Sequence, residues 1–458
     1  MSTPSNQSHP LKAVRGTRDL LPPETALWSH VESVARSVFA RYGFGEIRTP
    51  IFEATELFAR GVGEETDIVS KEMYTWEDRA RAQSEKAQSL TLRPENTAGV
   101  VRAYIEHKLG DSGQLQKLFY IGPQFRRERP QRGRYRQFWQ IGVEVLGPVS
   151  SGSESPIRDA EVLEMLATLL DELGVRGWQL ELNSVGSATD RPRYVAALRE
   201  ALAPVKHLMS EDNQRRAETN PLRVLDSKAP EDQALIDALP RIANYLDNAS
   251  TEHFGAVISA LSACGVPYTV NPRLVRGLDY YTRTTFEFTV PSGDATGLGT
   301  QNALLGGGRY DGLSEMLGGP RAPGIGFAIG EDRLILTLQA QAAAQATESG
   351  APHLASEMWV PKLDAYIAPL GVERNTAALA LARELRRANL SVEVGDGAFR
   401  LKKSFDAADQ VARCIVILGE DELATCILTV KTFATGVQLK LERNALADFL
   451  KTPPPTSL

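Results

Sequence analysis

Apolar residues recur at helical spacing near the start of the chain and mark its first structured element. The face that they form carries Trp28, Val31, Val34, Ala35 and Val38. Spacings of three and four residues place such side chains on one side of a helix, so the pattern predicts a helix that runs to about Arg41. A turn at Gly43 and a short strand at residues 46–49 follow, and Pro50 ends the strand.

Residues 117–147 carry the clearest strand pattern. Strands at residues 117–126 and 135–146 flank a charged loop, which predicts a long antiparallel hairpin. Successive side chains of a strand point to opposite faces. One face of the second strand is apolar. The other carries Arg136, Phe138, Gln140, Gly142 and Glu144, and Gly142 is expected to leave space among these larger side chains. The apolar face, with Trp139, Ile141, Val143 and Val145, belongs to a core, whereas the polar face is either solvated or the wall of a pocket.

A helical segment interrupts the strand-rich part of the chain. Further strands are predicted near residues 74–76, 90–93, 178–183, 276–290 and 300–306, and helices at 96–107, at 159–173 and from Glu331 on. Residues 186–265 are helical, polar and poor in strand signals. Strand character returns at Tyr268, so this stretch is interpreted as an insertion into one domain of residues 1–335.

A second domain follows a linker. Residues 336–358 are rich in Ala and Gln and indicate the end of a helix followed by a linker. From residue 359 to 458 the pattern alternates, with strands at 365–368, 392–394, 414–418 and 427–432 and helices at 376–388 and 408–413. Alternation of this kind predicts a small, separate α/β domain.

Composition narrows the class of protein. The chain has 458 residues and a net charge of −6, from 51 basic and 57 acidic residues, which excludes a uniformly basic nucleic-acid coat but leaves room for a local basic site. Three scattered cysteines without a CxxC pair and six scattered histidines predict no disulfide framework and no metal site, and they fit a reducing, cytoplasmic setting. The start lacks the features of a signal peptide, and no apolar run reaches the roughly 18 residues of a membrane span.

An arginine cluster is the strongest chemical signal. Six arginines fall within the eleven residues from Arg126 to Arg136, opposed by Glu128 alone. Arginine forks bind phosphate oxygens bidentately and stay charged at any relevant pH. A solvated basic loop is the simpler interpretation of an isolated basic run. Here the neighbouring strand face also offers the Phe138 ring and the polar groups of Gln140 and Glu144, which favours a pocket for a nucleotide and a small molecule.

Two other segments are weaker candidates. In LVRGLDYYTRTTFEF, Arg276 precedes a glycine, and a strand would place Tyr280 and Tyr281 on opposite faces, so that at most one points into a given pocket unless the backbone bulges. A strand with core tyrosines explains this segment about equally well. In PGIGFAIGEDR, glycines allow close backbone approach and Arg333 follows at a helix start. No P-loop, GxGxxG or GxSxG motif is present, so side chains would have to bind any phosphate.

Together these segments resemble the histidyl-tRNA synthetases, a family of class II aminoacyl-tRNA synthetases. The similarity covers nearly the whole chain after residue 12 and includes RGTRDLLP, TLRPENTAG, FRRERPQRGRYRQFWQIGVE, RGLDYYT, GGGRYDGL and PGIGFAIGEDR. The resemblance implies an α+β catalytic domain built on an antiparallel sheet, with the helical insertion, and a C-terminal α/β anticodon-binding domain. The first helix with its strand resembles motif 1, the dimer element, the arginine hairpin resembles motif 2, and GIGFAIGEDR resembles motif 3.

The resemblance also implies the activity and the residues that carry it. The enzyme would activate L-histidine with ATP, with Mg²⁺ on the leaving pyrophosphate, and transfer histidine to its tRNA. Histidine would be held by Glu95, Thr97, Gln140, Glu144, Tyr280 and Tyr281. ATP would be held by Arg126, Glu128, Arg134, Phe138 and Arg333, with Arg276 on the α-phosphate and the attacking carboxylate. Arg126, Arg276 and Arg333 would be the catalytic groups, in a cytoplasmic homodimer.

Two departures and two alternatives accompany this interpretation. Asn96 stands where relatives often have a small residue, and Arg127 where they often have His. One alternative is the paralogous regulatory subunit of ATP phosphoribosyltransferase, which lacks an anticodon-binding domain. Another is an RNA-binding module without catalysis, which the intact Arg126, Arg276 and Arg333 disfavour. Residues 359–458 carry 13 basic and 12 acidic residues, a balance that suits RNA backbone contact without identifying it.

Overall fold

The chain folds into two compact units, residues 1–356 and 357–458, and each has its own core. The computed structural model describes residues 11–63, 66–78, 87–278, 280–291, 302–348, 359 and 362–452. The later part of the predicted linker and the first residues of the strand predicted at 300–306 lie outside these ranges. Within the described residues, no helix combines the length and apolar character that crossing a membrane requires.

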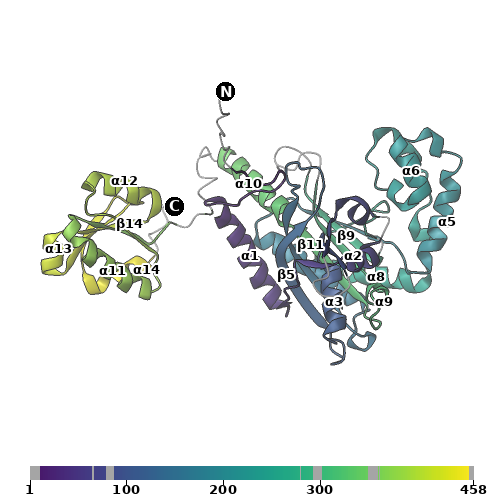
Figure 1. Ribbon diagram of the computed structural model, residues 1–458, viewed down its shortest axis with the longest axis horizontal. Helices are drawn as coiled ribbons and strands as arrows, with labels where there is room; N and C mark the ends of the chain where they lie inside the picture. Colours follow the sequence, from purple (N-terminus) through teal and green to yellow (C-terminus); the bar gives the residue numbers. More distant parts are fainter. Residues whose placement is uncertain are drawn as a thin grey trace, which may run out of the picture. The chain divides into compact units, whose positions relative to one another are not determined.

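An eight-stranded sheet forms the centre of the first unit (Figure 1). Its middle six strands are antiparallel to their neighbours, in the order β5 (Gln116–Phe125), β6 (Gln137–Leu146), β11 (Gly324–Gly330), β10 (Ala303–Arg309), β9 (Thr282–Thr289) and β7 (Gln179–Ser184). Short parallel strands, β1 (Gly45–Glu46) and β8 (Thr269–Val270), form its two edges. The predicted hairpin is confirmed, and its residues Ile141, Val143 and Val145 are buried as expected.

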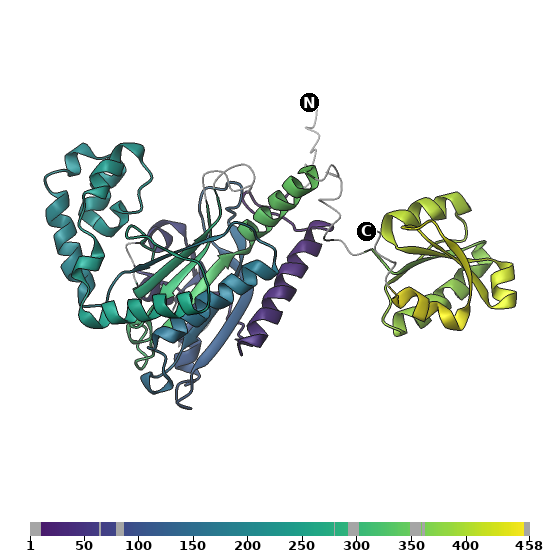
Figure 2. The ribbon, with the colours of Figure 1, turned by 180° about the vertical axis from the view of Figure 1, so that it is seen from behind.

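Helices cover both faces of this sheet. On one face lie α1 (Glu24–Arg41), α4 (Pro156–Glu172) and α8 (Asn248–Ala263), as Figure 2 shows. The apolar stripe predicted for α1 is buried, and its Phe39 ring lies 5.3 Å from the ring of Phe119 on β5. The other face carries α2 (Thr55–Val62), α3 (Thr97–Glu106) and α9 (Leu313–Met316), with a small sheet of β2 (Phe52–Ala54), β4 (Gln88–Leu92) and β3 (Tyr74–Asp78). Helix α10 (Glu331–Glu348) follows β11 directly.

The stretch predicted as an insertion is helical. It contains α5 (Asp190–Leu202), α6 (Glu211–Thr219), α7 (Gln233–Asp237) and α8, with short 3-10 segments between them. Its apolar residues, among them Tyr194, Leu198 and Leu222, share one buried cluster with Tyr280, Tyr281 and Tyr310 of the sheet-forming part. The insertion therefore packs against the segment that carries the two candidate tyrosines.

A buried ion cluster joins three elements beneath the sheet. The Arg309 guanidinium at the end of β10 is fully buried and bonds to Asp159 of α4 and to the Ser153 carbonyl at 3.0 Å. His253 of α8 reaches the same Asp159 at 2.9 Å. Burial raises the pKa of Asp159, but the Arg309 charge and the His253 bond outweigh it and bring the pKa to about 2. This lowered pKa stabilises the fold above about pH 4, and the stabilisation is lost as the pH falls toward 2.

Replacing Arg309 by leucine is expected to lower the free energy of unfolding of the first unit by about 3–5 kcal/mol. The change leaves the Asp159 carboxylate buried without its main partner. Urea denaturation followed by circular dichroism measures the loss. Arg321→Leu is the matched control, because Arg321 forms an exposed pair with Glu154 worth about 1 kcal/mol or less. Equal losses in the two variants would contradict the assigned role of Arg309.

The second unit is a five-stranded α/β sheet. Its strand order is β13 (Val392–Val394), β12 (Ala365–Pro369), β14 (Cys414–Leu418), β15 (Ile427–Thr432) and β16 (Gln438–Glu442). The first three strands are parallel and the last two pair antiparallel. Its helices are α11 (Asn375–Arg387), α12 (Leu401–Val411), α13 (Glu420–Thr425) and α14 (Leu446–Lys451). The sequence pattern placed the second helix too late, at 408–413, and did not predict β16.

Candidate active site

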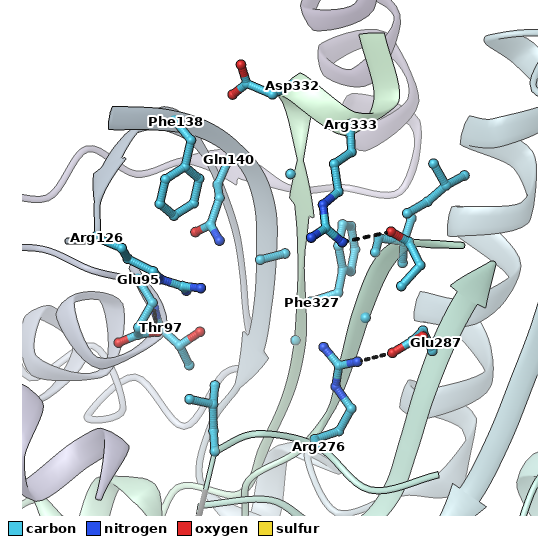
Figure 3. Close-up of a pocket in the computed structure, with 18 of the residues that line it drawn as sticks. Glu95, Thr97, Arg126, Phe138, Gln140, Arg276, Glu287, Phe327, Asp332 and Arg333 are labelled. Atoms are coloured by element: carbon cyan, nitrogen blue, oxygen red, sulfur yellow. Dashed lines mark hydrogen bonds and ion pairs between the residues drawn. The ribbon is translucent and has the colours of Figure 1, made fainter. Parts of the chain in front are cut away.

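A cavity of about 310 Å³ opens beside the central sheet (Figure 3). Its wall comes from the segment before α3, from the hairpin β5–β6 and its loop, from β9, β10 and β11, and from the start of α10. Eleven of the predicted site residues line it: Glu95, Thr97, Arg126, Glu128, Arg134, Phe138, Gln140, Arg276, Tyr280, Tyr281 and Arg333. The twelfth, Glu144, lies just behind the wall. Segments separated by more than two hundred residues therefore meet at one site.

Three other residues of the arginine loop, Glu128, Gly133 and Arg134, line the cavity together with Arg126. Arg126 is held in place by its Nε, which donates to the Pro94 carbonyl at 2.9 Å, and its guanidinium lies 5.1 Å from the centre of the Phe138 ring. Burial lowers the pKa of Arg126. The Arg134 guanidinium lies 3.7 Å from the Glu128 carboxylate. Cations, a carboxylate and an aromatic ring thus share one end of the cavity, which is the set of groups that a nucleotide needs.

Arg333 supplies a further cation from the first turn of α10. Its Nη1 donates to the Ala303 carbonyl at 3.1 Å, a contact that Figure 3 draws as a dashed line. Burial lowers the pKa of Arg333, and the positive charge of Arg134 lowers it further. Two arginines whose charges repel across a cavity favour a polyanion between them.

Arg276 faces the cavity from the other side and is paired with a carboxylate. Its Nη1 lies 2.5 Å from Glu287 Oε2 on β9 (Figure 3). A Cβ atom at Gly306 would lie 2.5 Å from the Arg276 guanidinium, so a side chain there would displace it. Burial raises the pKa of Glu287 and the Arg276 charge opposes this, so the pair depends on both partners.

A polar cluster closes the end of the cavity near α3. The Glu95 carboxylate accepts bonds from the backbone N–H groups of Thr97 at 2.7 Å and Ala98 at 3.0 Å, and so caps this helix. The Thr97 hydroxyl donates to Glu144 Oε1 at 2.7 Å, and the Tyr310 hydroxyl donates to Glu144 Oε2 at 2.6 Å. Thr97 and Tyr310 both line the cavity, so they connect Glu144 to it.

Glu144 is the most strongly perturbed acid of this cluster. Burial raises its pKa to about 8, the bonds from Tyr310 and Thr97 act against this, and the nearby Glu95 charge adds to it. A carboxyl group with a pKa near neutrality can exchange a proton with an imidazole, whose own pKa is about 6.5. Gly326 is necessary for this arrangement, because a Cβ at that position would overlap the Glu144 carboxylate.

The expected space at Gly142 is already filled. A Cβ there would collide with the Tyr120 ring and with the Phe327 carbonyl, so this glycine accommodates a tyrosine of the neighbouring strand rather than a ligand. The interpretation of Gly142 as space left in the pocket was wrong. The Gln140 amide, two residues earlier, does reach the cavity, and its Oε1 is buried without a partner among the described residues.

The two tyrosines do not lie on the strand that the sequence pattern predicted. Tyr280 and Tyr281 precede β9, which begins at Thr282, so the alternation of a strand does not apply to them. Both rings are buried and line the cavity, with centroids 4.7 Å apart. Arg283, at the start of β9, has a φ of 49°, which breaks the extended path that the sequence pattern assumed.

Comparisons with known proteins place this geometry in a family. The profile described as histidyl-tRNA synthetase matches residues 16–334, and that described as anticodon binding domain matches residues 364–452. A protein of Koribacter versatilis named histidine–tRNA ligase is 65% identical over 96% of both chains. The chain belongs to the histidyl-tRNA synthetase family. A solved apo histidyl-tRNA synthetase from S. aureus matches 96% of this chain and 100% of its own, with 36% identity and a TM-score of 0.74. The predicted class II fold is confirmed.

The comparisons do not favour the alternative that this chain is a regulatory subunit of ATP phosphoribosyltransferase. A structure from Bacillus halodurans, titled as an ATP phosphoribosyltransferase regulatory subunit/histidyl-tRNA synthetase, covers 90% of this chain and 99% of its own at 19% identity and a TM-score of 0.59. Identity this low establishes a shared fold and nothing further. The anticodon-binding match at residues 364–452 is the part that this alternative was expected to lack.

The two departures from the synthetase pattern lie outside the cavity wall. Asn96 Oδ1 accepts a bond from the Thr49 hydroxyl at 2.6 Å, so this side chain joins α3 to the segment after β1. Arg127 lies 6.0 Å from the centre of the Tyr74 ring, and its backbone N–H bonds to the Glu72 carbonyl. Neither side chain lines the cavity. Each is a sequence neighbour of residues in the cavity wall.

Sequence reasoning missed Glu287, Tyr310, Tyr120 and Asp332, which also line the cavity. Tyr310 lies two residues after the glycine triplet of β10, and this neighbourhood was a usable signal. Glu287 is the single acidic residue of the threonine-rich strand β9, which was another usable signal. Tyr120 and Asp332 carried no comparable signal, because only the pairing of β6 with β5 and β11 brings them to the cavity.

Proposed function

We propose that this cavity is where the chain, a histidine–tRNA ligase, activates histidine with ATP before transfer to the tRNA. The observation that carries the proposal is the convergence of Arg126, Arg276 and Arg333 on one cavity whose far end holds the Glu144 cluster. The arginines suit a triphosphate, and the cluster suits a small polar side chain. The cavity therefore offers separate regions for the two substrates of one reaction.

The ATP region lies at the arginine end. Arg126 binds the α-phosphate, Phe138 stacks on the base and Glu128 accepts from the adenine amino group. Arg333 and Arg134 bind the far phosphates, which relieves the repulsion between these two arginines. No three carboxylate, His or Cys side chains gather to hold a metal among the described residues, so Mg²⁺ would arrive on the phosphates, and the wall offers it the carboxylates of Glu95, Glu128, Glu287 and Asp332. There it would neutralise charge on the leaving pyrophosphate.

The histidine region lies at the Glu144 end. Glu95, Thr97 and the unpartnered Gln140 oxygen hold the α-amino group. Glu144 and Tyr281 take the two imidazole nitrogens, and Tyr280 packs beside them. Because a carboxyl and a phenol offer paired polar groups, an amino acid without two ring nitrogens would leave one of them unpaired.

The reaction needs no nucleophile from the protein. A carboxylate oxygen of histidine forms the bond to the α-phosphorus, and the bond from this phosphorus to pyrophosphate breaks, with the electron pair leaving on pyrophosphate. Negative charge builds on the α-phosphate oxygens, where Arg126 and Arg276 can stabilise it. Positioning and charge therefore supply the catalysis.

The second unit binds the anticodon region of the histidine tRNA in this proposal. Its support is the anticodon-binding match and the separate core of residues 357–458. The homodimer expected from motif 1 and the cytoplasmic location stay predictions.

Pyrophosphate exchange into ATP tests the proposed function directly. The protein is incubated with ATP, labelled pyrophosphate and each of the twenty amino acids in turn. Exchange that depends on histidine supports the proposal. Exchange with another amino acid, or with none, would reject the assignment of the cavity.

Replacing Glu144 by glutamine is expected to raise the KM for histidine about 10- to 100-fold. An amide has one acceptor oxygen, so Thr97 or Tyr310 loses its acceptor and the imidazole loses a charged partner. The KM for ATP should change less than about threefold. Steady-state exchange with each substrate varied measures both values.

Glu161→Gln is the matched control for this variant, because Glu161 pairs with Lys117 away from the cavity. It should leave both KM values unchanged. Equal damage by Glu144→Gln to the two substrates, or none to histidine, would mean that Glu144 does not read the imidazole.

A further inference from the structure

Arg18, which lies before the first helix, contacts both halves of the proposed ATP region. Its Nη2 donates to Asp332 Oδ1 at 3.0 Å, in the first turn of α10 and next to Arg333. Its guanidinium also lies 4.6 Å from the centre of the Tyr135 ring, next to Arg134. A third contact, to Glu24 at 2.9 Å, points away from the site toward α1.

The segment around Arg18 is itself fastened to the arginine loop. The Arg136 backbone N–H donates to the Gly16 carbonyl at 2.7 Å, and Arg136 Nη1 donates to the Arg15 carbonyl at 3.1 Å. Gly16 has a φ of +91°, and a Cβ there would lie 2.8 Å from carbons of Arg136 and Pro130. This close contact fixes the path of residues 15–18 across the base of the loop.

Within the loop, Arg134 and Gln131 exchange backbone hydrogen bonds at 2.9 and 3.1 Å, a local bridge that does not tie the loop to the sheet, and the Arg127 N–H bonds to the Glu72 carbonyl. The strands β5 and β6 pair only as far as Phe125 and Gln137, and the loop residues between them lie beyond the sheet. A backbone bond between Arg126 and the Arg136 carbonyl extends the pairing by one step. The position of Arg134 therefore depends on how its neighbours Tyr135 and Arg136 are anchored, and residues 15–18 provide part of that anchor.

The other end of the Arg18 bridge is more rigid. Asp332 accepts a second bond, from the Trp139 backbone N–H to Oδ2 at 3.2 Å, and its side chain is nearly fully buried. Arg18 thus links a fixed point beside Arg333 to a loop that carries Arg134. Arg134 and Arg333 repel each other. Without an anchor, a loop position with Arg134 farther from Arg333 would therefore have the lower electrostatic energy.

We propose that Arg18 is a positioning residue that sets the spacing between Arg134 and Arg333 for the triphosphate of ATP. The inference rests on the proposed function of the cavity. Arg18 does not line the cavity, and it acts through Asp332 and Tyr135. Its loss should weaken ATP binding and leave the histidine region, at the other end of the cavity, unaffected.

Arg18→Gln is expected to raise the KM for ATP in histidine-dependent exchange about tenfold, the size of effect that one charged contact commonly gives. The KM for histidine should stay within twofold. Arg18→Lys keeps a cation between Asp332 and the Tyr135 ring and should restore at least half of the loss. Glu24→Gln is the matched control, since it removes the third contact of Arg18 and should leave both KM values unchanged.

A double-mutant cycle separates positioning from general destabilisation. If Arg18 acts on the loop through the Tyr135 ring, Tyr135→Leu added to Arg18→Gln should give little further rise in the ATP KM. Additive effects would overturn the proposal. So would an equal rise in the two KM values, or an effect of Glu24→Gln as large as that of Arg18→Gln.

ATP binding measured by calorimetry, without histidine, distinguishes this inference from the proposed function. Weaker ATP binding by Arg18→Gln than by the wild type supports the positioning role even if exchange failed with histidine. Equal ATP binding by folded wild type and variant would overturn it even if histidine-dependent exchange were normal.

Discussion

Arg276→Ala is expected to slow histidine-dependent pyrophosphate exchange by about 10²- to 10³-fold while the protein stays folded. Removing one donor that stabilises developing charge typically costs about 3–4 kcal/mol in the transition state. The side chain is 24% exposed at the cavity wall, and its guanidinium is already oriented by Glu287 and by the space at Gly306. Most of its contribution is therefore expected in kcat rather than in either KM.

Glu287→Gln separates the loss of the cation from the loss of its partner. This variant keeps Arg276 but weakens its orientation, so its loss of activity should be clearly smaller. Arg321→Ala, at an exposed arginine, should leave exchange unchanged, and circular dichroism checks the fold of each variant. Near-normal exchange by folded Arg276→Ala would remove this residue from the catalytic set.

Deleting residues 359–458 is expected to leave histidine activation within about threefold of the full chain and to reduce tRNA charging by at least about a hundredfold. The lining residues that the structure describes all belong to the first unit, and each unit has a core of its own. Activation needs only the cavity, whereas charging needs the tRNA to be held. Exchange and aminoacylation of a histidine tRNA, measured on the same preparation, give the two values.

Aminoacylation by the isolated first unit at the rate of the full chain would show that the second unit does not hold the tRNA. Loss of both activities, with the first unit folded by circular dichroism, would instead show that activation depends on the second unit. As a control, the two units are expressed separately and mixed. Covalent linkage raises the effective concentration of the second unit next to the first, so the mixture should not recover tRNA charging at the same protein concentration.

The fold could be predicted from sequence where local pattern and tertiary environment agree. The α1 stripe and the alternation on β6 each place apolar residues on a buried face, and both predictions are confirmed. The strand predicted at residues 46–49 is shorter in the structure and spans Gly45–Glu46, because only these two residues pair with β5. Helix α12 begins at Leu401, earlier than predicted, although Leu401, Phe405 and Ala408 fall at helical spacing and make its first turns predictable from the sequence.

The candidate site was predictable in its members but less so in its geometry. For motif residues such as Arg126 and Arg333, the residue type and the motif are enough to predict binding of a phosphate, so their presence at one cavity could be expected. The depth of Glu144, the pairing of Arg276 with Glu287 and the position of Tyr281 depend on strand register and on the point where β9 begins. The hydrogen bond from Arg18 to Asp332 joins residues more than three hundred positions apart, and no local sequence pattern predicts it.

The glycine-lined part of the cavity wall has a consequence for inhibitors. Gly306 and Gly326 present bare backbone there, and a side chain at either position would displace Arg276 or overlap Glu144. A compound that makes its main contacts with these peptide groups would meet a surface that resistance mutations can hardly alter, because the substitutions that block the compound would also disable the enzyme. Resistance mutations would have to arise in the arginine loop, where side chains rather than backbone form the wall.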